Sequence, residues 1–166
     1  MARALIVGCG CRGRMLGERL LADGWAVRGT SRREEGLDAI REAGIEPTIA
    51  DPLWPGTVLD LVGDVSLVGW LLGSARAEGE DGEAEVAAIH GERLERLLER
   101  LVETPVRGFA YEAAGSVDAT VLGAGRRAVE AAAETWRIPV ATVAVDPSQP
   151  ERWAEGMAAA AFRLMG

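Results

Sequence analysis

Short apolar segments alternate along this chain with longer segments in which apolar side chains recur at helical spacing. The short segments predict buried strands, and the longer ones predict amphipathic helices. The expected strands are Ala4–Val7, Trp25–Thr30, Pro47–Ala50, Val65–Leu72, Arg107–Tyr111 and Ile138–Val145. The expected helices are one that carries Leu16, Leu20 and Leu21, then Glu34–Ala43, Thr57–Val62, Glu85–Glu103, Ala119–Trp136 and Glu151–Met165. Because strands and helices alternate throughout, the sequence predicts an α/β fold with a parallel, doubly wound sheet.

The junction between the first strand and the first helix is a glycine loop, in which residues 8–13 read GCGCRG. This spacing of glycines, between a strand and a helix, is the fingerprint of a dinucleotide-binding Rossmann unit. Gly8 permits the tight turn, Gly10 lets the backbone approach a pyrophosphate, and Gly13 lets the helix pack close to the strand. We therefore expect a single Rossmann-like sheet in the strand order 3-2-1-4-5-6. The alternative is an ordinary glycine-rich turn that binds no ligand.

Length and composition limit what else the chain contains. At 166 residues it is long enough for one domain, residues 1–166, and too short for a dinucleotide domain plus a full substrate domain. Hydrophobic residues make up 48% of it, which predicts a folded chain. No apolar run approaches the ~20 residues that span a bilayer, and the first apolar run is a strand rather than a signal peptide. We expect a cytoplasmic protein with no membrane partner.

The charged and metal-binding residue types exclude several classes of partner. A formal net charge of −8 argues against nucleic acid. Cys9 and Cys11 are the only cysteines and His90 is the only histidine, so we expect neither a disulfide scaffold nor a metal site. The simplest interpretation of the two cysteines is that small side chains fit the loop. The alternative is a reactive thiol, whose pKa the helix N-terminus and the neighbouring arginines would lower.

The end of the second expected strand bears on the choice of cofactor. In NAD-binding Rossmann units, an acidic residue about 20 positions beyond the loop accepts hydrogen bonds from the ribose 2′-OH. Here the strand ends in Ser31, Arg32 and Arg33, with no acid among them. A serine hydroxyl and a guanidinium suit a 2′-phosphate, and Arg12 in the glycine loop is a second cation that could reach it. The sequence predicts NADP(H) over NAD(H), with solvated surface charges and NAD as the alternative.

Several of these segments together resemble a known family. The glycine loop, the second strand over residues 24–32, Asp51 after the third strand and the sequence RGFAY at residues 107–111 are similar to the atypical or extended short-chain dehydrogenases/reductases, the NAD-dependent epimerase-like group. The resemblance implies that Asp51 contacts the adenine amino group and that the end of the fourth strand lies beside the cofactor. The expected cofactor-binding residues are Gly8, Gly10, Cys11, Arg12, Gly13, Ser31, Arg32, Asp51, Leu72 and Gly73.

The chain departs from that family at its catalytic residues. Family members use a serine and a Tyr-x-x-x-Lys pair, in which the lysine lowers the pKa of the tyrosine that transfers the proton. This chain has no lysine, and its only tyrosine, Tyr111, falls on the fifth strand. The tyrosine and lysine positions fall on Leu122 and Arg126, and the serine position falls near Ala113 or Ala114. The chain also ends where family members continue into a substrate-binding region. We therefore assign no catalytic residue.

Other candidate residues have weaker support. His90 lies within an expected helix, where a lone histidine is usually structural or exposed. A triad of Ser116, His90 and Asp118 is conceivable, but no nucleophile-elbow pattern accompanies it. Among the tryptophans, we expect Trp25, Trp70 and Trp136 in the core and Trp54 and Trp153 partly exposed.

Three functions remain after these exclusions. The first is a protein that binds NADP(H) or NAD(H) without standard short-chain dehydrogenase catalysis, as a cofactor sensor, a regulator or a subunit of something larger. The second is an oxidoreductase that takes its proton from water or substrate. The third is a degenerate domain that dimerises and binds no nucleotide. A homodimer is predicted through the helices after strands four and five, where Leu94, Leu97, Leu98 and Leu101 form a wide apolar stripe, or through the Ala-rich terminal helix.

Overall fold

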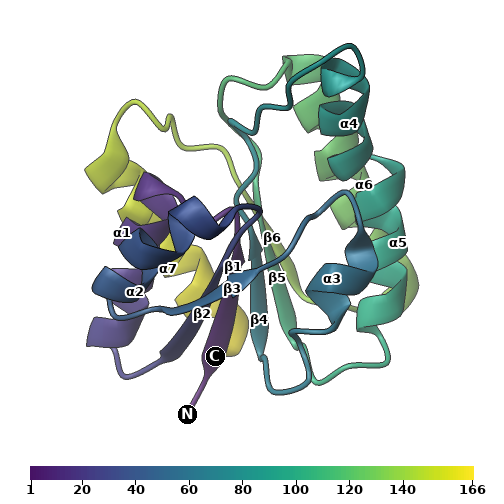
Figure 1. Cartoon of the computed structure of the whole chain (residues 1–166). Coiled ribbons are helices and arrows are strands. Elements are labelled where there is room, and N and C mark those ends of the chain that lie inside the picture. Colours follow the sequence, from purple (N-terminus) through teal and green to yellow (C-terminus); the bar gives the residue numbers. More distant parts are fainter.

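Six short strands pair in parallel to form one sheet in the order β3-β2-β1-β4-β5-β6, which confirms the predicted order (Figure 1). The computed structural model describes residues 1–166. The strands are β1 (Arg3–Val7), β2 (Ala26–Ser31), β3 (Glu46–Ile49), β4 (Leu67–Trp70), β5 (Gly108–Glu112) and β6 (Val140–Val143). Neighbouring strands are in direct register, as where Ala4 of β1 lies between Val27 of β2 and Leu67 of β4.

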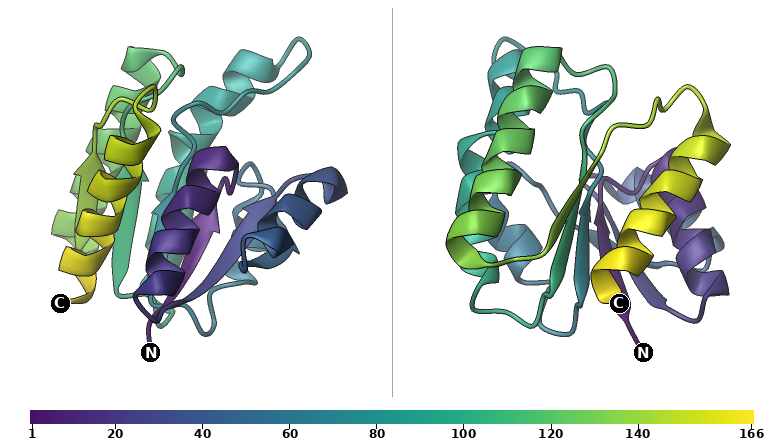
Figure 2. Two further views of the ribbon diagram at one scale, coloured as in Figure 1. Left: turned by 90° about the vertical axis from the view of Figure 1, so that its left-hand side faces the viewer. Right: turned by 180° about the vertical axis from the view of Figure 1, so that it is seen from behind.

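Helices cover both faces of the sheet. They are α1 (Cys11–Ala22), α2 (Leu37–Glu42), α3 (Pro55–Leu59), α4 (Gly82–Ile89), α5 (Glu92–Leu101), α6 (Ala119–Trp136) and α7 (Pro150–Met165), with a short 3-10 turn η1 (Glu34–Gly36) before α2. One layer contains α1, α2 and α7, and the other contains α3 to α6 (Figure 1). Figure 2 shows from behind that α7 lies beside α1 and that α6 lies on the opposite face.

The first strand shows why its sequence is continuously apolar. Ala4 and Ile6 belong to the core under α1, α2 and α7, whereas Leu5 and Val7 belong to the core under α3 to α6. All four side chains are buried. A parallel strand whose two faces are both covered needs apolar residues at every position rather than at alternate ones. The predicted doubly wound architecture is therefore confirmed by the way each face is filled.

One expected helix is two helices. The sequence predicted a single helix over Glu85–Glu103, but α4 ends at Ile89 and α5 begins at Glu92. His90 lies between them with its side chain turned into the core, where it is 0% exposed. Gly91 lies so close to the preceding turn that an added Cβ would be 3.0 Å from the Ala87 carbonyl oxygen. The expected single helix is therefore divided at His90 and Gly91.

The leucine stripe of α5 is covered within the chain. Leu94, Leu97, Leu98 and Leu101 are all buried in the core under α3 to α6. They therefore leave no apolar stripe free for a second copy. The homodimer stays a prediction, but the leucine stripe no longer supports it.

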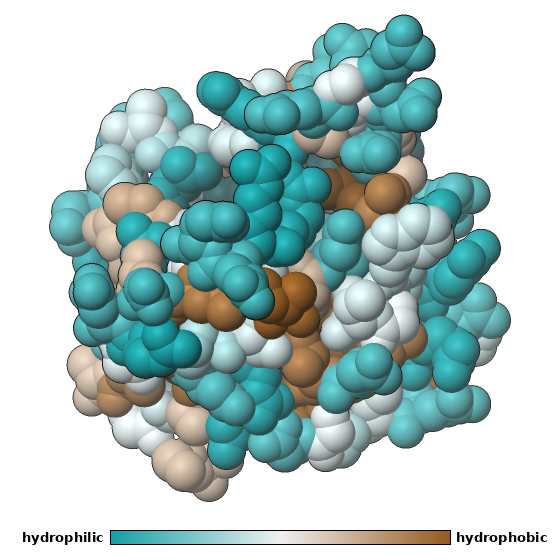
Figure 3. Space-filling view, viewed as in Figure 1, coloured by the Kyte–Doolittle hydropathy of each residue, from teal (hydrophilic) through white to brown (hydrophobic).

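The tryptophans differ from expectation at two positions. Trp153 was expected to be partly exposed and is 1% exposed, because its indole N–H is bonded to a buried carboxylate. Trp136 was expected in the core and is 42% exposed, because it is the last residue of α6. Most of the face drawn in Figure 3 is hydrophilic, and its apolar surface is limited to patches near the middle.

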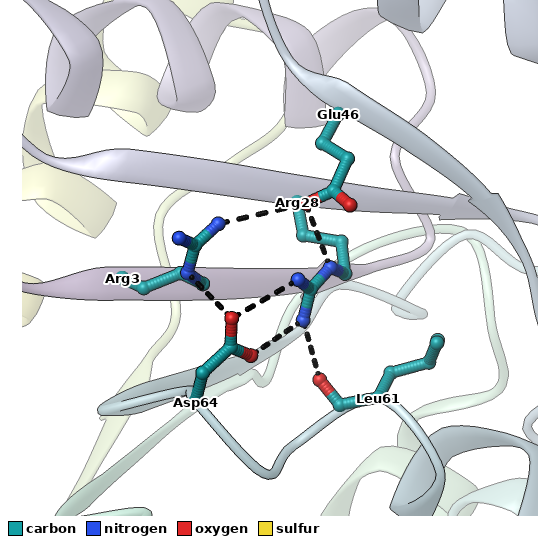
Figure 4. Close-up of polar contacts among 5 residues, drawn as sticks. All are labelled: Arg3, Arg28, Glu46, Leu61 and Asp64. Atoms are coloured by element: carbon teal, nitrogen blue, oxygen red, sulfur yellow. Dashed lines mark hydrogen bonds and ion pairs between the residues drawn. The ribbon is translucent and has the colours of Figure 1, made fainter.

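A network of charged side chains joins the strands at the amino end of the sheet (Figure 4). The Arg28 guanidinium of β2 lies 2.9 Å from the Glu46 carboxylate of β3 and 2.8 Å from that of Asp64, which precedes β4. It also donates to the Leu61 carbonyl, and Arg3 of β1 lies 3.1 Å from Asp64. Because the two carboxylates are half exposed, each ion pair contributes little alone. The network lies at the edge opposite the glycine loop.

No helix in the chain is both long enough and apolar enough to serve as a membrane span.

Candidate functional site at the carboxyl edge of the sheet

The glycine loop is built as its sequence predicts. Gly8 has a φ of +86°, and an added Cβ there would lie 2.5 Å from the Leu71 carbonyl oxygen, so only glycine fits. An added Cβ at Gly13 would lie 3.0 Å from the Gly8 oxygen, which lets α1 begin close to β1. By contrast, an added Cβ at Gly10 would meet nothing within 4 Å. The loop therefore leaves open space in front of Gly10 alone.

The first turn of α1 presents unpaired donors to that space. Gly10 is the N-cap, and its carbonyl accepts the first helical hydrogen bond, from the N–H of Arg14. The N–H groups of Cys11, Arg12 and Gly13 find no acceptor within the chain. A helix N-terminus with free N–H groups attracts anions, because its dipole adds positive charge there. This turn suits a phosphate group.

A cavity of about 500 Å³ opens beside the glycine loop, along the carboxyl ends of β1 to β5. It is lined by every residue expected to bind a cofactor except Gly73, that is by Gly8, Gly10, Cys11, Arg12, Gly13, Ser31, Arg32, Asp51 and Leu72. Gly73 lies behind the wall instead, where its N–H donates to Glu112 Oε1 at 2.7 Å. Residues distant in the sequence thus meet at one edge of the sheet.

The polar residues after β2 and β3 are held by local hydrogen bonds. Ser31 Oγ donates to the Arg33 carbonyl and accepts from the Arg33 N–H, at 2.7 and 3.1 Å. Arg32 Nη2 donates to the Arg76 carbonyl at 3.1 Å, which links the end of β2 to the segment after β4. Asp51 Oδ1 accepts from the Leu53 N–H at 2.9 Å. These bonds fix the chain at the mouth of the cavity.

The two cysteines lie in different environments. Cys9 is buried against Gly29, and burial raises the pKa of its thiol to about 12 although Arg14 acts in the opposite direction. The alternative interpretation, a reactive thiol, is therefore wrong for Cys9, since desolvation outweighs the nearby positive charge. Cys11 is exposed and lines the cavity.

Arg12 lies on the β5 side of the cavity. Its guanidinium is 5.7 Å from the centre of the Trp153 ring, and its Nε is buried without a hydrogen-bond partner. In the sheet, β1 and β4 separate β5 from β2, the strand that leads to Arg32. Arg12 thus contacts Trp153 on the side of the cavity near β5, whereas Arg32 follows β2.

Glu112 is a site residue that lies one position beyond the expected fifth strand, Arg107–Tyr111. It is the last residue of β5 and is 1% exposed at the wall of the cavity. Its carboxylate accepts from the Gly73 N–H and from Trp153 Nε1, each at 2.7 Å. Burial raises its pKa, although the Gly73 N–H, Arg12 and Trp153 act in the opposite direction. An acid at the end of a buried strand is the signal that could have identified it.

The family's catalytic positions hold no replacement here. Leu122 is buried, and Arg126 lies outside the cavity with its Nε 3.1 Å from Glu130 Oε1. Tyr111 is fully buried, and its hydroxyl lies 2.6 Å from His90 Nδ1. Burial raises the pKa of Tyr111. The tyrosine is part of the core rather than of the cavity.

The conceivable triad of Ser116, His90 and Asp118 does not form. Both ring nitrogens of His90 are used within the core, by the Tyr111 hydroxyl and by the Leu72 carbonyl at 2.8 Å. Asp118 caps α6 by accepting from the Thr120 N–H at 2.8 Å. His90 is thus a structural residue of the core, which was one of the two alternatives expected from the sequence, and it is not exposed. Nor do three or more His, Cys, Asp or Glu side chains gather into a group that could hold a metal ion.

No family model matches the sequence, and no curated protein matches it either. Solved structures do match. UDP-glucuronic acid 4-epimerase from Bacillus cereus, in complex with NAD, has a TM-score of 0.70 at 14% identity, over 87% of this chain and 56% of that one. A short-chain dehydrogenase/reductase superfamily protein from Agrobacterium tumefaciens with bound NAD gives 0.68 at 20% identity, over 84% and 48%.

An NAD⁺-bound xylitol dehydrogenase matches along more of its length. Its TM-score is 0.68 at 19% identity, over 96% of this chain and 76% of that one. Against the epimerase and the Agrobacterium protein, by comparison, the chain spans about half the length. At these identities the likeness is one of fold. The chain therefore has the Rossmann-like fold of the short-chain dehydrogenase/reductase and NAD-dependent epimerase structures.

Proposed function

We propose that this protein binds a nicotinamide dinucleotide in the cavity beside the glycine loop. The observation that carries the proposal is the set of free N–H groups on Cys11, Arg12 and Gly13, which face the open space in front of Gly10. A pyrophosphate there supplies the acceptors that the helix N-terminus lacks. The bound NAD in structures of the same fold supports the same choice of ligand.

The preferred cofactor in this proposal is NADP(H). The end of β2 carries Ser31 and Arg32 where an NAD site has a carboxylate. A guanidinium binds phosphate through parallel N–H groups, and one N–H group of Arg32 donates to the Arg76 carbonyl. A 2′-phosphate is a stronger, charged acceptor than that carbonyl. Asp51, on the same side of the cavity, accepts from the adenine amino group.

The proposed activity is binding without standard short-chain dehydrogenase catalysis, as in a cofactor sensor, a regulator or a subunit. When bound, the nicotinamide would supply or accept a hydride. The chain places no proton donor of the usual kind there, because Leu122 and Arg126 occupy the family's tyrosine and lysine positions and Tyr111 is buried against His90. General acid–base help of that kind is typically worth about 10²–10⁴-fold. A homodimer remains part of the proposal.

The test of cofactor choice is calorimetry of NADPH and NADH against the wild type, Arg32→Ala and Arg33→Ala. Arg33 is the matched control, since it neighbours Arg32 but does not line the cavity. We expect tighter binding of NADPH by the wild type. Arg32→Ala should weaken NADPH binding by tenfold or more, since a charged hydrogen bond is worth roughly 1.5–3 kcal/mol, and should leave NADH binding nearly unchanged.

Two results would contradict the assignment. One is equal affinity of the wild type for the two nucleotides. The other is an Arg32→Ala variant that loses both nucleotides to the same degree, or that behaves like Arg33→Ala.

A further inference from the structure

A second arginine lies directly beside Arg32. Arg76 belongs to the segment that joins β4 to α4 in Figure 1, and it lines the same cavity as Arg32. Arg32 Nη2 donates to the Arg76 carbonyl at 3.1 Å, so the two residues are in contact although 44 positions separate them in the sequence. The structure thus brings together one arginine that follows β2 and one that follows β4.

The bond from Arg32 is the main restraint on this part of the segment. Residues 76–78 belong to no helix or strand. Apart from the bond from Arg32, they make no hydrogen bond, whether to backbone or to side chain. The place of Arg76 in the cavity wall therefore depends on Arg32.

Neither arginine is neutralised within the chain. Neither Arg32 nor Arg76 forms an ion pair, although the chain has 26 acidic residues against 18 basic ones. The carboxylates that line the cavity are those of Asp51, Glu85 and Glu112, and none of them pairs with either arginine. Two like charges held close together repel each other, so an anion that contacts both stabilises them.

A phosphate monoester fits this pair better than a hydroxyl does. At neutral pH it carries a charge of about −1.5 to −2, which two guanidinium groups balance and one does not. A guanidinium has five N–H donors, and the Arg76 carbonyl accepts from only one of those on Arg32. The guanidinium of Arg76 donates to no group of the chain. A ribose 2′-hydroxyl, by contrast, has no charge for a second cation to bind.

We propose that Arg76 is the second cation of the 2′-phosphate site, and that Arg32 and Arg76 together determine the preference for NADP(H) over NAD(H). This inference rests on the proposed function, because it needs the adenosine of a dinucleotide at the end of β2. Arg32 has two roles in it, since it binds the phosphate and holds Arg76 in place. Arg12, the second cation suggested by the sequence, contacts Trp153 near β5. The sequence alone could not single out Arg76, because its neighbours do not show that it meets the end of β2.

The test is calorimetry with two pairs of probes, NADPH against NADH and adenosine 2′,5′-bisphosphate against 5′-AMP. The members of each pair differ only by the 2′-phosphate. Arg76→Met should lower the affinity for the two phosphorylated probes by about tenfold and leave NADH and 5′-AMP nearly unchanged. Arg33→Met is the matched control, because it removes the same charge next to Arg32 but outside the cavity lining, and it should behave like the wild type.

Two further variants test the charge and the link between the arginines. Arg76→Glu should bind NADPH more weakly than Arg76→Met does, with NADH again nearly unchanged, because a carboxylate repels the 2′-phosphate. Arg32→Ala releases Arg76 as well as removing a phosphate ligand. The loss of NADPH affinity in the double variant, Arg32→Ala with Arg76→Met, should therefore be smaller than the product of the two single losses.

Four results would overturn the role of Arg76. They are an Arg76→Met variant that keeps the full preference for NADPH, one that loses NADPH and NADH to the same degree, an Arg76→Glu variant that binds NADPH as the wild type does, and single losses that multiply in the double variant. A protein that prefers NADPH with or without Arg76 would refute this inference alone. A protein that binds neither NADPH nor NADH would refute the proposed function itself.

Discussion

At the scale of single residues, the surroundings of a side chain decide its chemistry more than its place in the motif does. Cys9 and Cys11 lie two positions apart in the glycine loop, yet Cys9 is buried against Gly29 and Cys11 is exposed in the cavity. With its pKa raised from 9.0 to about 12, the Cys9 thiol has roughly a thousandfold less thiolate at a given pH.

This contrast predicts the outcome of thiol labelling. In the native protein near pH 8, one thiol should react quickly with a disulfide reagent and the other only on unfolding. Cys11→Ser should remove the fast phase, and Cys9→Ala should leave it. Saturating NADPH should slow the fast phase, because Cys11 lines the proposed cofactor cavity. Equal rates for the two native thiols would contradict the burial of Cys9, and a lack of protection by NADPH would count against the cofactor's location.

Glu112 predicts a specific dependence of stability on pH. Its pKa is raised by burial, so the folded state holds the proton more tightly than the unfolded state does. The wild type therefore loses free energy of unfolding as the pH rises above the ordinary value of 4.5 toward the folded-state pKa. Glu112→Gln has no such ionisation, although one of the N–H donors of Gly73 and Trp153 loses its acceptor.

The free energy of unfolding of the wild type minus that of Glu112→Gln should be largest near the acid end and fall with rising pH. Urea unfolding of wild type and Glu112→Gln at about pH 5 and pH 8 measures it. A difference that stays constant, or grows with pH, would show that Glu112 is not held in the way described.

At the scale of elements, the break between α4 and α5 is fixed by contacts that the local sequence does not contain. The Leu72 carbonyl can only accept, so His90 Nε2 carries the hydrogen and Nδ1 accepts from the Tyr111 hydroxyl. Burial lowers the pKa of His90, which keeps this neutral form. The pair joins the junction after α4 to β5 and to the end of β4.

Tyr111→Phe removes the only donor to His90 Nδ1 and leaves a buried acceptor unpaired. We expect it to lower the free energy of unfolding by about 1–3 kcal/mol, the usual cost of such a group. Urea unfolding at neutral pH measures the loss, and nucleotide affinity should change little because Tyr111 is outside the cavity lining. Unchanged stability would show that the hydroxyl is not needed to hold the junction.

The same element shows how far the sequence could predict the structure. The alternation of strands and helices was enough for the parallel sheet. Together with the glycine spacing it was enough for the strand order and for the loop from β1 to α1, because these depend on local pattern and on general rules of connection. The division at His90 and the burial of Trp153 could not be predicted, because each depends on a partner from another strand, Tyr111 or Glu112. The same holds for Arg12, whose position follows from Trp153.

At the scale of the whole molecule, the fold places the ion pairs that join the strands and the cavity that could bind a ligand at opposite edges of the sheet. The ion-pair network joins β1, β2 and β3 at the amino edge of the sheet, whereas the cavity beside the glycine loop opens at the carboxyl edge. In parallel sheets the loops after the strands converge at that edge, which is where ligands bind. The central claim is that the glycine loop at this edge receives the pyrophosphate of a dinucleotide.

Calorimetry of NADPH against the wild type, Gly10→Ala and Gly56→Ala tests that claim most directly. Neither Gly10 nor Gly56 has a positive φ, and an added Cβ at either would meet nothing within 4 Å, so both variants should fold. The wild type and Gly56→Ala should bind NADPH alike. Gly10→Ala places a methyl group where the pyrophosphate would lie and should bind at least about tenfold more weakly, a loss of about 1.4 kcal/mol. A wild type that binds neither NADPH nor NADH, or a Gly10→Ala variant that binds as well as Gly56→Ala, would contradict the claim.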